Sequence, residues 1–345
     1  MSSSSWATQV ARFSNQYLQV ESGLDFPDSS VLKLEQVQNA LYQNLFADDA
    51  VQFGPPPRYQ LRVLKELVKR IEASIDDWDE YGVSDELMSA LSLLLATPLP
   101  SEATSVQQKC YVTYRLSALD NTETLDGSGE TKPHQITLFE NRSLISASGT
   151  TGLRTWEAAL HLGTYLCKNS NAVKGKRILE LGAGTGYLSI LCAILGAAHV
   201  IASDGSDDVI NNLPENLFLN NLQDSATVTP MEVKWGHALV GTEEDKWNGG
   251  RAVDVVLGAD ITYDQSVIPA LVGTLLDVFD LYPSVEVYIS ATQRNEKTFH
   301  VFLDKCKGNG LTVQDLAFQL PGLESQEGPF YNDKVPIRIC KVSRS

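Results

Sequence analysis

Three glycines at alternate positions stand near acidic residues in the middle of the chain. They are Gly182, Gly184 and Gly186, and they follow a short apolar stretch. Glycines at this spacing let the backbone turn tightly and let a ligand lie close against it. A second apolar stretch, 199–203, leads to Asp204, roughly twenty residues beyond the glycines, where an acidic side chain can bind ribose hydroxyls. The spacing predicts a nucleoside-containing ligand at a turn between a strand and a helix.

Glu180 and Tyr187, on either side of the glycines, depart from the pattern that binds a dinucleotide. Tyr187 stands where a pyrophosphate-binding turn has a small residue for close helix packing. The Glu180 carboxylate would repel a diphosphate but would attract a positively charged ligand. S-adenosylmethionine carries positive charge on its amino group and on its sulfonium. The residues therefore favour S-adenosylmethionine over NAD or another nucleotide, and over a turn that binds no ligand.

Two tryptophans stand at positions that the same ligand site would use. Trp156 lies between a glycine-containing loop, 148–155, and an expected helix that runs through Leu166. It either belongs to the core, as most tryptophans in such places do, or covers the ligand. Trp235 follows an expected strand over 226–233, so its ring either stacks on adenine or packs in an ordinary way.

Asp260 and Tyr263 follow a further buried stretch, 253–259. Ligands of open α/β sheets bind beyond the carboxyl ends of the strands, which places both residues beside the ligand site. The structural alternatives are a helix N-cap for Asp260 and ordinary packing for Tyr263. We favour a place in the active site because both residues stand at a strand end.

These motifs need a sheet whose strands alternate with helices. The expected strands are 177–181, 199–203, 226–233, 253–259, 285–290, 311–316 and 336–342. The expected helices are 187–195, 207–221, 266–282 and 299–306. Turn residues over 320–335 suit a hairpin, so the last strand is expected to run antiparallel. The pattern predicts an α/β fold built on a seven-stranded, Rossmann-like sheet.

The N-terminal part of the chain carries apolar residues at helical spacing and no chemical motif. This spacing predicts helices near 34–45 and 61–75, and a third helix that begins at its N-cap Ser84. The module is either a structural cap on the rest of the protein or a partner-recognition module, and the sequence does not favour one over the other.

Two stretches rich in β-forming residues follow the helices. They are 111–116 and 135–140, and a polar, glycine-containing segment separates them, which predicts a β-hairpin. We therefore expect two domains: an N-terminal helical module over 1–105, and the hairpin plus the seven-stranded domain over 106–345.

Charge and cysteine content exclude some partners. The chain has 43 Asp and Glu against 27 Lys and Arg, a formal charge of -16, so we expect it to repel phosphate backbones and to bind no nucleic acid. Five cysteines without a CxxC pair indicate reduced thiols and no metal site. There is no basic-then-apolar signal and no apolar run that could span a bilayer, so we expect no membrane partner and a cytoplasmic protein.

Several segments together resemble one enzyme family. They are the loop 149–156, the stretch Glu180–Gly186, Asp204, Lys234-Trp235-Gly236 and the pair Asp260 and Tyr263 in an Asp-x-x-Tyr tetrapeptide. On these segments the chain is similar to the seven-β-strand methyltransferases of the lysine-specific group. With its helical N-terminal module, the whole chain resembles the eukaryotic elongation factor 2 lysine methyltransferase family.

The resemblance implies an S-adenosylmethionine-dependent protein-lysine N-methyltransferase whose protein substrate is elongation factor 2. It places the cofactor contacts on Trp156, Gly182, Ala183, Gly184, Asp204, Trp235 and Ala259. To these contacts the glycine turn itself adds Glu180 and Gly186. We also expect the enzyme to be a monomer.

Lysine methylation gives Asp260 and Tyr263 specific tasks. Methyl transfer is an in-line displacement at the sulfonium carbon, so alignment supplies much of the acceleration. Asp260 would hold the incoming ammonium and orient the amine, while Tyr263 would hydrogen-bond the same nitrogen or line an aromatic slot. The alternatives are a methyltransferase of another protein or of a small molecule, and a non-catalytic adaptor with the same fold.

Overall fold

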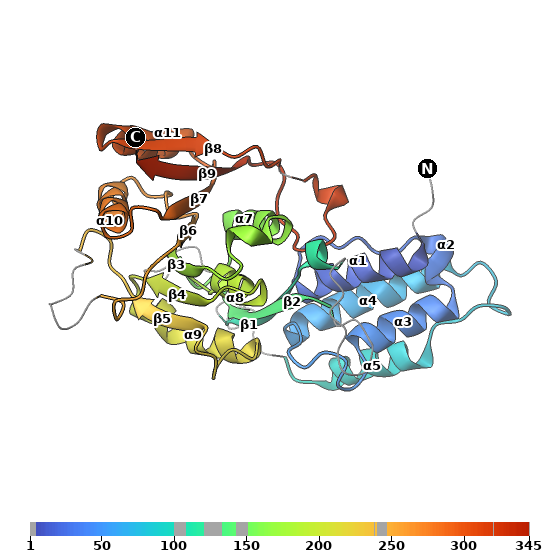
Figure 1. Cartoon of the computed structure of the whole chain (residues 1–345). Coiled ribbons are helices and arrows are strands. Elements are labelled where there is room, and N and C mark those ends of the chain that lie inside the picture. The colour runs from blue at the N-terminus through green and yellow to red at the C-terminus, as the bar shows by residue number, and fades with distance from the viewer. Residues whose placement is uncertain are drawn as a thin grey trace. The chain divides into compact units, whose positions relative to one another are not determined.

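The computed structural model of the chain describes residues 5–99, 108–120, 133–142, 151–237, 239, 247–319 and 321–344. The chain forms two compact units (Figure 1). The first, which we call the helical unit, comprises Met1–Ser117, Thr137–Ser143 and Glu327–Phe330. The second, the sheet unit, comprises Ala118–Ile136, Leu144–Gln326 and Tyr331–Ser345. The predicted domain boundary near residue 105 stays a prediction.

The described part of the helical unit contains the helices α1 to α5, which pack around one apolar core. They are α1 (Trp6–Leu18), α2 (Ser29–Leu32), α3 (Glu35–Leu45), α4 (Pro57–Ser74) and α5 (Asp85–Ala96). The predicted helices correspond to α3, α4 and α5, and the Ser84 hydroxyl caps α5 by accepting from the Leu87 N–H at 3.3 Å. Within the described ranges, no helix combines the length and the apolar character that crossing a membrane requires.

Helix α1 was not expected from the sequence. Its buried residues Val10, Phe13 and Tyr17 do recur at helical spacing, but serine, asparagine and glutamine residues separate them. The Ser5 side chain caps α1 by accepting from the Thr8 N–H at 3.3 Å. The N-cap of α1 is thus the last residue of a run of serines, and such a run does not mark the start of a helix clearly in the sequence.

Strands β1 (Cys110–Arg115) and β2 (Gln135–Glu140) form the expected two-stranded sheet, with the 3₁₀ turn η1 (Ser117–Leu119) after β1. Within the helical unit, a buried polar network joins this sheet to α1. The Tyr114 hydroxyl donates to Glu140 at 2.8 Å, and the Arg142 guanidinium donates to the Gln19 carbonyl and to Glu21. The Gln19 side chain in turn accepts from the Phe330 N–H at 2.8 Å.

The sheet unit alternates helices and strands as predicted. It contains α7 (Glu157–Lys168), η2 (Ser170–Ala172), β3 (Arg177–Leu181), α8 (Tyr187–Ile194), β4 (His199–Asp204), α9 (Asp207–Leu219), β5 (Val228–Glu232), β6 (Val255–Ala259), α10 (Ile268–Leu281), β7 (Glu286–Thr292), α11 (Glu296–Gly308), β8 (Leu311–Asp315), η3 (Leu323–Ser325) and β9 (Ile337–Arg344).

The seven strands lie in the order β5-β4-β3-β6-β7-β9-β8. The first five in this order run parallel, and β9 runs antiparallel to both β7 and β8, which confirms the expected direction of the last strand. Since β3 has β4 on one side and β6 on the other, the order of connection reverses at β3. Open α/β sheets bind their ligands outside the carboxyl ends of the strands at such a reversal.

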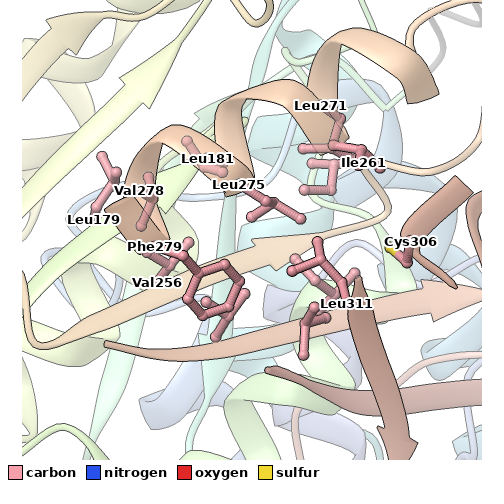
Figure 2. Close-up of a cluster of buried hydrophobic side chains, with 14 of the residues drawn as sticks. Leu179, Leu181, Val256, Ile261, Leu271, Leu275, Val278, Phe279, Cys306 and Leu311 are labelled. Carbon is pink, nitrogen blue, oxygen red and sulfur yellow. The ribbon is translucent and has the colours of Figure 1, made fainter. Parts of the chain in front are cut away.

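The core of the sheet unit fixes the strands that end at this reversal. Figure 2 shows Leu275 and Val278 of α10 facing Leu179 and Val256, which lie on β3 and β6. All four side chains are fully buried. Buried on both faces, these strands read as continuous apolar runs, and this is why the sequence reveals them.

Candidate active site

A cavity of about 910 Å³ opens in the sheet unit beyond the carboxyl ends of β3, β4 and β6. It is large enough for a cofactor together with the end of a substrate side chain. Most of the residues that the sequence singles out line it: Trp156, Glu180, Gly182, Ala183, Gly184, Asp204, Trp235, Ala259, Asp260 and Tyr263. Gly186 does not line the cavity.

The glycine turn leaves no room for side chains where it faces the cavity. The φ angles of Gly182 and Gly184 are +69° and +54°, and residues other than glycine rarely adopt such values. A Cβ atom at Gly182 would lie 2.7 Å from Ile261, and one at Gly184 would lie 3.0 Å from the Gly152 carbonyl oxygen. Gly186, with φ +84°, serves the start of α8 and packs toward Leu213.

Glu180 is less available as a negative charge than its position in the sequence indicates. Its carboxyl is buried at the end of β3 and accepts a hydrogen bond from the Ser189 hydroxyl. Desolvation by burial raises the pKa of Glu180 to about 8. In the free protein at neutral pH the group is therefore mostly protonated, and it must lose this proton before it attracts a cation.

Asp204 ties the end of β4 to the glycine turn. One carboxylate oxygen accepts from the Gly184 N–H at 3.2 Å and the other from the Ser206 N–H at 3.0 Å. A carboxylate accepts about four hydrogen bonds, so Asp204 keeps acceptor capacity for the hydroxyls of a ribose. Desolvation by burial raises the pKa of Asp204, and the backbone hydrogen bonds oppose this shift.

The two tryptophans form parts of the cavity wall. The Trp235 ring lies 3.5 Å from the position that a Cβ of Gly182 would take. Its buried indole N–H has no hydrogen-bond partner among the described residues. The Trp156 N–H donates to the Thr151 carbonyl at 3.0 Å, which fixes the ring at the start of α7. The Trp235 ring thus lies beside the glycine turn, where an adenosyl group would fit, and the Trp156 ring lines the same cavity.

Asp260 is held by its neighbours more firmly than the sequence indicates. It is only 8% exposed, and its carboxylate accepts from the Thr292 N–H at 2.8 Å and from the Thr292 hydroxyl at 2.9 Å. An Arg294 nitrogen lies 3.6 Å from the same carboxylate. Desolvation by burial raises the pKa of Asp260, and Arg294 and the Thr292 hydrogen bonds oppose the shift. The N-cap alternative is wrong, because the next helix begins at Ile268 with Val267 as its cap.

Tyr263 lies at the open rim of the cavity. The residue is 59% exposed, which does not fit the alternative of ordinary packing. The Thr151 hydroxyl lies 3.4 Å from the Tyr263 hydroxyl, so the contact between them is weak. The Tyr263 hydroxyl therefore remains available to a bound substrate.

Several polar residues of the cavity wall do not stand out individually in the sequence. Arg154, Thr292 and Arg294 are among them. Thr292 ends β7 and Arg294 follows it, so their position at a carboxyl strand end was the signal that could have found them. Neither residue belongs to a motif, and their link to Asp260 depends on which strand lies next to β6 in the sheet.

Comparisons with known proteins identify the family. A family model described as lysine methyltransferase matches residues 135–308. The chain belongs to this family. It is 59% identical to the protein-lysine N-methyltransferase EFM3 of Chaetomium thermophilum over 97% of this chain and 98% of that protein. It is 29% identical to EFM3 of Saccharomyces cerevisiae over 78% of both chains. It is 28% identical to the human protein-lysine N-methyltransferase EEF2KMT over 78% of this chain and 76% of that one.

The protein is an S-adenosylmethionine-dependent protein-lysine N-methyltransferase. The cavity fits this cofactor, because the turn Gly182–Gly184 and the side chains of Asp204 and Trp235 line it together. The unpartnered Trp235 N–H and the remaining acceptor capacity of Asp204 offer it hydrogen bonds. The bound cofactor supplies the methyl group on its sulfonium, and the protein supplies the alignment.

Proposed function

We propose that this enzyme methylates a lysine of translation elongation factor 2, and that it acts as a monomer in the cytoplasm. The observation that carries a protein substrate is the exposed Tyr263 at the rim, with the buried Asp260 below it. A lysine side chain is long and narrow enough to pass from a protein surface into such a cavity. The similarity to human EEF2KMT and the helical N-terminal module support elongation factor 2 as that substrate.

Asp260 and Tyr263 act on the methyl acceptor in this proposal. A lysine with a pKa near ~10.4 must lose its proton before it attacks, which costs about 4–5 kcal/mol at pH 7. Asp260 is fixed by Thr292, so it can orient an amine without reorganising. Tyr263 offers its hydroxyl to the same nitrogen from the rim.

The first prediction tests the acceptor-side role with Asp260→Asn. Asparagine keeps the size of the side chain, can still accept from the Thr292 N–H, and tolerates the φ of +52° at this position. The substitution replaces one carboxylate oxygen, an acceptor for the amine, by an NH₂ group that can only donate, so the single-turnover rate on purified elongation factor 2 should fall by more than tenfold, about 1.4 kcal/mol. Cofactor affinity, measured by calorimetry, should change much less.

Asp264→Asn is the matched control. Asp264 carries the same charge shortly after Asp260 in the chain but is not among the residues that line the cavity. Its carboxylate accepts from the N–H and the hydroxyl of Ser266 in a local turn. The rate of this variant should stay within about twofold of the wild type. If the wild type leaves elongation factor 2 unmethylated by mass spectrometry, the proposed substrate is wrong. If Asp260→Asn fails only because cofactor no longer binds, its acceptor-side role is wrong.

A further inference from the structure

Two arginines lie against Trp156 at the mouth of the cavity, and two acidic residues contact these arginines. The Arg294 guanidinium lies 4.9 Å from the centre of the Trp156 ring, and the Arg154 guanidinium lies 4.8 Å from it. Glu157 receives one contact from each arginine: a hydrogen bond from Arg294, and an Arg154 nitrogen at 3.7 Å. Of the two arginines, Arg294 also contacts Asp260: one of its guanidinium nitrogens lies 3.6 Å from an Asp260 carboxylate oxygen.

The four charges of this cluster are therefore balanced, while the carboxyl groups of Glu180 and Asp204, on β3 and β4, line the cofactor side of the same cavity. Asp260 and Glu157 bring two negative charges, and Arg294 and Arg154 bring two positive ones. Helix α11 and its N-cap Asn295 add only uncharged residues to the cavity wall, with Thr298 and Phe299 from the helix itself, and α10 and its N-cap add only apolar residues. Lys234, on the β5 side, pairs with Glu232.

This balance matters because a lone carboxylate would oppose the reaction. A carboxylate within about 4–6 Å of an ammonium favours the charged form and raises its pKa, by roughly 1–3 units. The reaction needs the neutral amine, so an unbalanced Asp260 would bind the lysine in the unreactive form. A guanidinium on the same carboxylate removes this cost and leaves the oxygens as hydrogen-bond acceptors.

We propose that Arg294 is a positioning residue that neutralises Asp260, so that the substrate lysine binds beside a balanced pair and loses its proton more readily. The inference rests on the proposed acceptor-side role of Asp260. Arg294 reaches this place from the end of β7, between Trp156 and Asp260, and is 42% exposed at its side chain. It thus touches both the wall of the cofactor site and the group that faces the acceptor.

The test is the pH dependence of the single-turnover rate at saturating cofactor and elongation factor 2. This rate reports ionisations in the enzyme–substrate complex, including that of the bound lysine. In Arg294→Gln, the limb on which the rate rises with pH should move upward by about one unit, because Asp260 and Glu157 lose their balancing charge. The rate at pH 7 should then fall about tenfold and recover at higher pH. Arg294→Lys should keep the limb in its wild-type position.

Two further variants separate this role from a purely structural one. Arg154→Gln removes the guanidinium that pairs with Glu157 rather than with Asp260, so the limb should move upward by less than in Arg294→Gln, even if cofactor affinity falls. Glu157→Gln removes a negative charge, so the limb should move in the opposite direction, to lower pH.

An equal loss of rate at every pH in Arg294→Gln would overturn the proposal, and so would an unmoved limb in both Arg294→Gln and Glu157→Gln. If Arg294→Gln cannot be saturated with cofactor, the direction of the shift in Glu157→Gln decides. The wild-type rate on elongation factor 2 decides the proposed substrate separately. If that rate is zero, the same profiles are measured on the lysate protein that the wild type labels with radioactive cofactor.

Discussion

Glu180 and Asp260 are two buried carboxyl groups with different surroundings at the same edge of the sheet. Glu180 has a hydroxyl partner, Ser189, and burial raises its pKa to about 8. Asp260 has a backbone N–H, a hydroxyl and a guanidinium around it, which oppose the effect of burial. The two groups are therefore suited to different tasks: Glu180 responds to the charge of a ligand, and Asp260 keeps a fixed position.

The raised pKa of Glu180 predicts a pH-dependent affinity for S-adenosylmethionine. A cationic ligand beside Glu180 favours the ionised carboxylate, so below pH 8 binding must release the proton that the free protein holds. Affinity should therefore rise with pH, by up to about tenfold per unit, and level off above pH 8. Calorimetry in buffers of different ionisation enthalpy measures the released proton directly.

Glu180→Gln provides the comparison, because glutamine keeps a neutral partner for the Ser189 hydroxyl. This variant should lose the proton release and most of the pH dependence between pH 6 and 8. The same variant should also differ in stability. The pKa of Glu180 is higher in the folded protein than in the unfolded chain. The free energy of unfolding of the free protein therefore falls as the pH rises from the pKa of the unfolded chain to about 8, and Glu180→Gln removes this fall. If the wild type and Glu180→Gln show the same pH dependence of cofactor affinity, Glu180 is not the group that releases the proton.

Much of the site could be predicted from neighbouring residues in the chain. Glu180, Gly182 and Gly184 stand together in the sequence, and Asp204 follows at a spacing that parallel strands impose. The partners of Asp260 could not be predicted in this way. Thr292 and Arg294 reach it because β7 lies next to β6, and this neighbour relation is a property of the folded sheet.

At the scale of elements, the sheet unit was predictable because its buried strands are continuous apolar runs bounded by turns. Helix α1 was less apparent, because polar residues separate Val10, Phe13 and Tyr17 and a run of serines precedes the helix. Tyr187, which stands where a pyrophosphate-binding turn has a small residue, shows how two helices fit against each other. Tyr187 is fully buried at the start of α8, and Gly163 of α7 makes room for its ring.

This pairing of helices predicts the effect of Gly163→Ala. The new Cβ would lie 2.8 Å from Tyr187 Cε1 and 3.0 Å from Leu191, and both of these side chains are fully buried. Overpacking costs about 1–3 kcal/mol. Alanine is better than glycine in a helix by about 1 kcal/mol. We expect a net loss of about 1 kcal/mol from the free energy of unfolding of the sheet unit, measured in urea.

A double-mutant cycle with Tyr187→Leu checks the cause. In that background the closest clash is gone, so Gly163→Ala should cost at most half as much or become stabilising. If Gly163→Ala lowers the free energy of unfolding equally in the wild type and in Tyr187→Leu, the glycine is needed for a reason other than the tyrosine ring.

At the scale of the whole molecule, the two units have separate apolar cores. One core consists of residues between Val10 and Leu94, and the other of residues between Leu179 and Val342. The cavity that fits the cofactor is lined by residues of the sheet unit alone, from Thr151 to Phe299. Cofactor binding and the stability of the helical unit should therefore be separable.

Leu64→Ala tests this separation. Leu64 is fully buried in α4, so its truncation should remove about 2–5 kcal/mol from the stability of the helical unit. Leu275→Ala, in the core of the sheet unit, is the matched variant. Adenosylhomocysteine at about a hundred times its dissociation constant should add about 2.7 kcal/mol to the unit that binds it. Calorimetric unfolding should show two transitions. The ligand should raise the midpoint temperature of only one of them, the one whose midpoint Leu275→Ala lowers.

The same variant tells a recognition module from a structural cap. At a temperature where Leu64→Ala has unfolded the helical unit and left the sheet unit intact, cofactor affinity should equal that of the wild type. If the helical unit recognises the substrate, methylation of elongation factor 2 should be lost under these conditions. If it is a cap, both transitions should move together and cofactor affinity should fall with them. Undiminished methylation with an unfolded helical unit would exclude both roles.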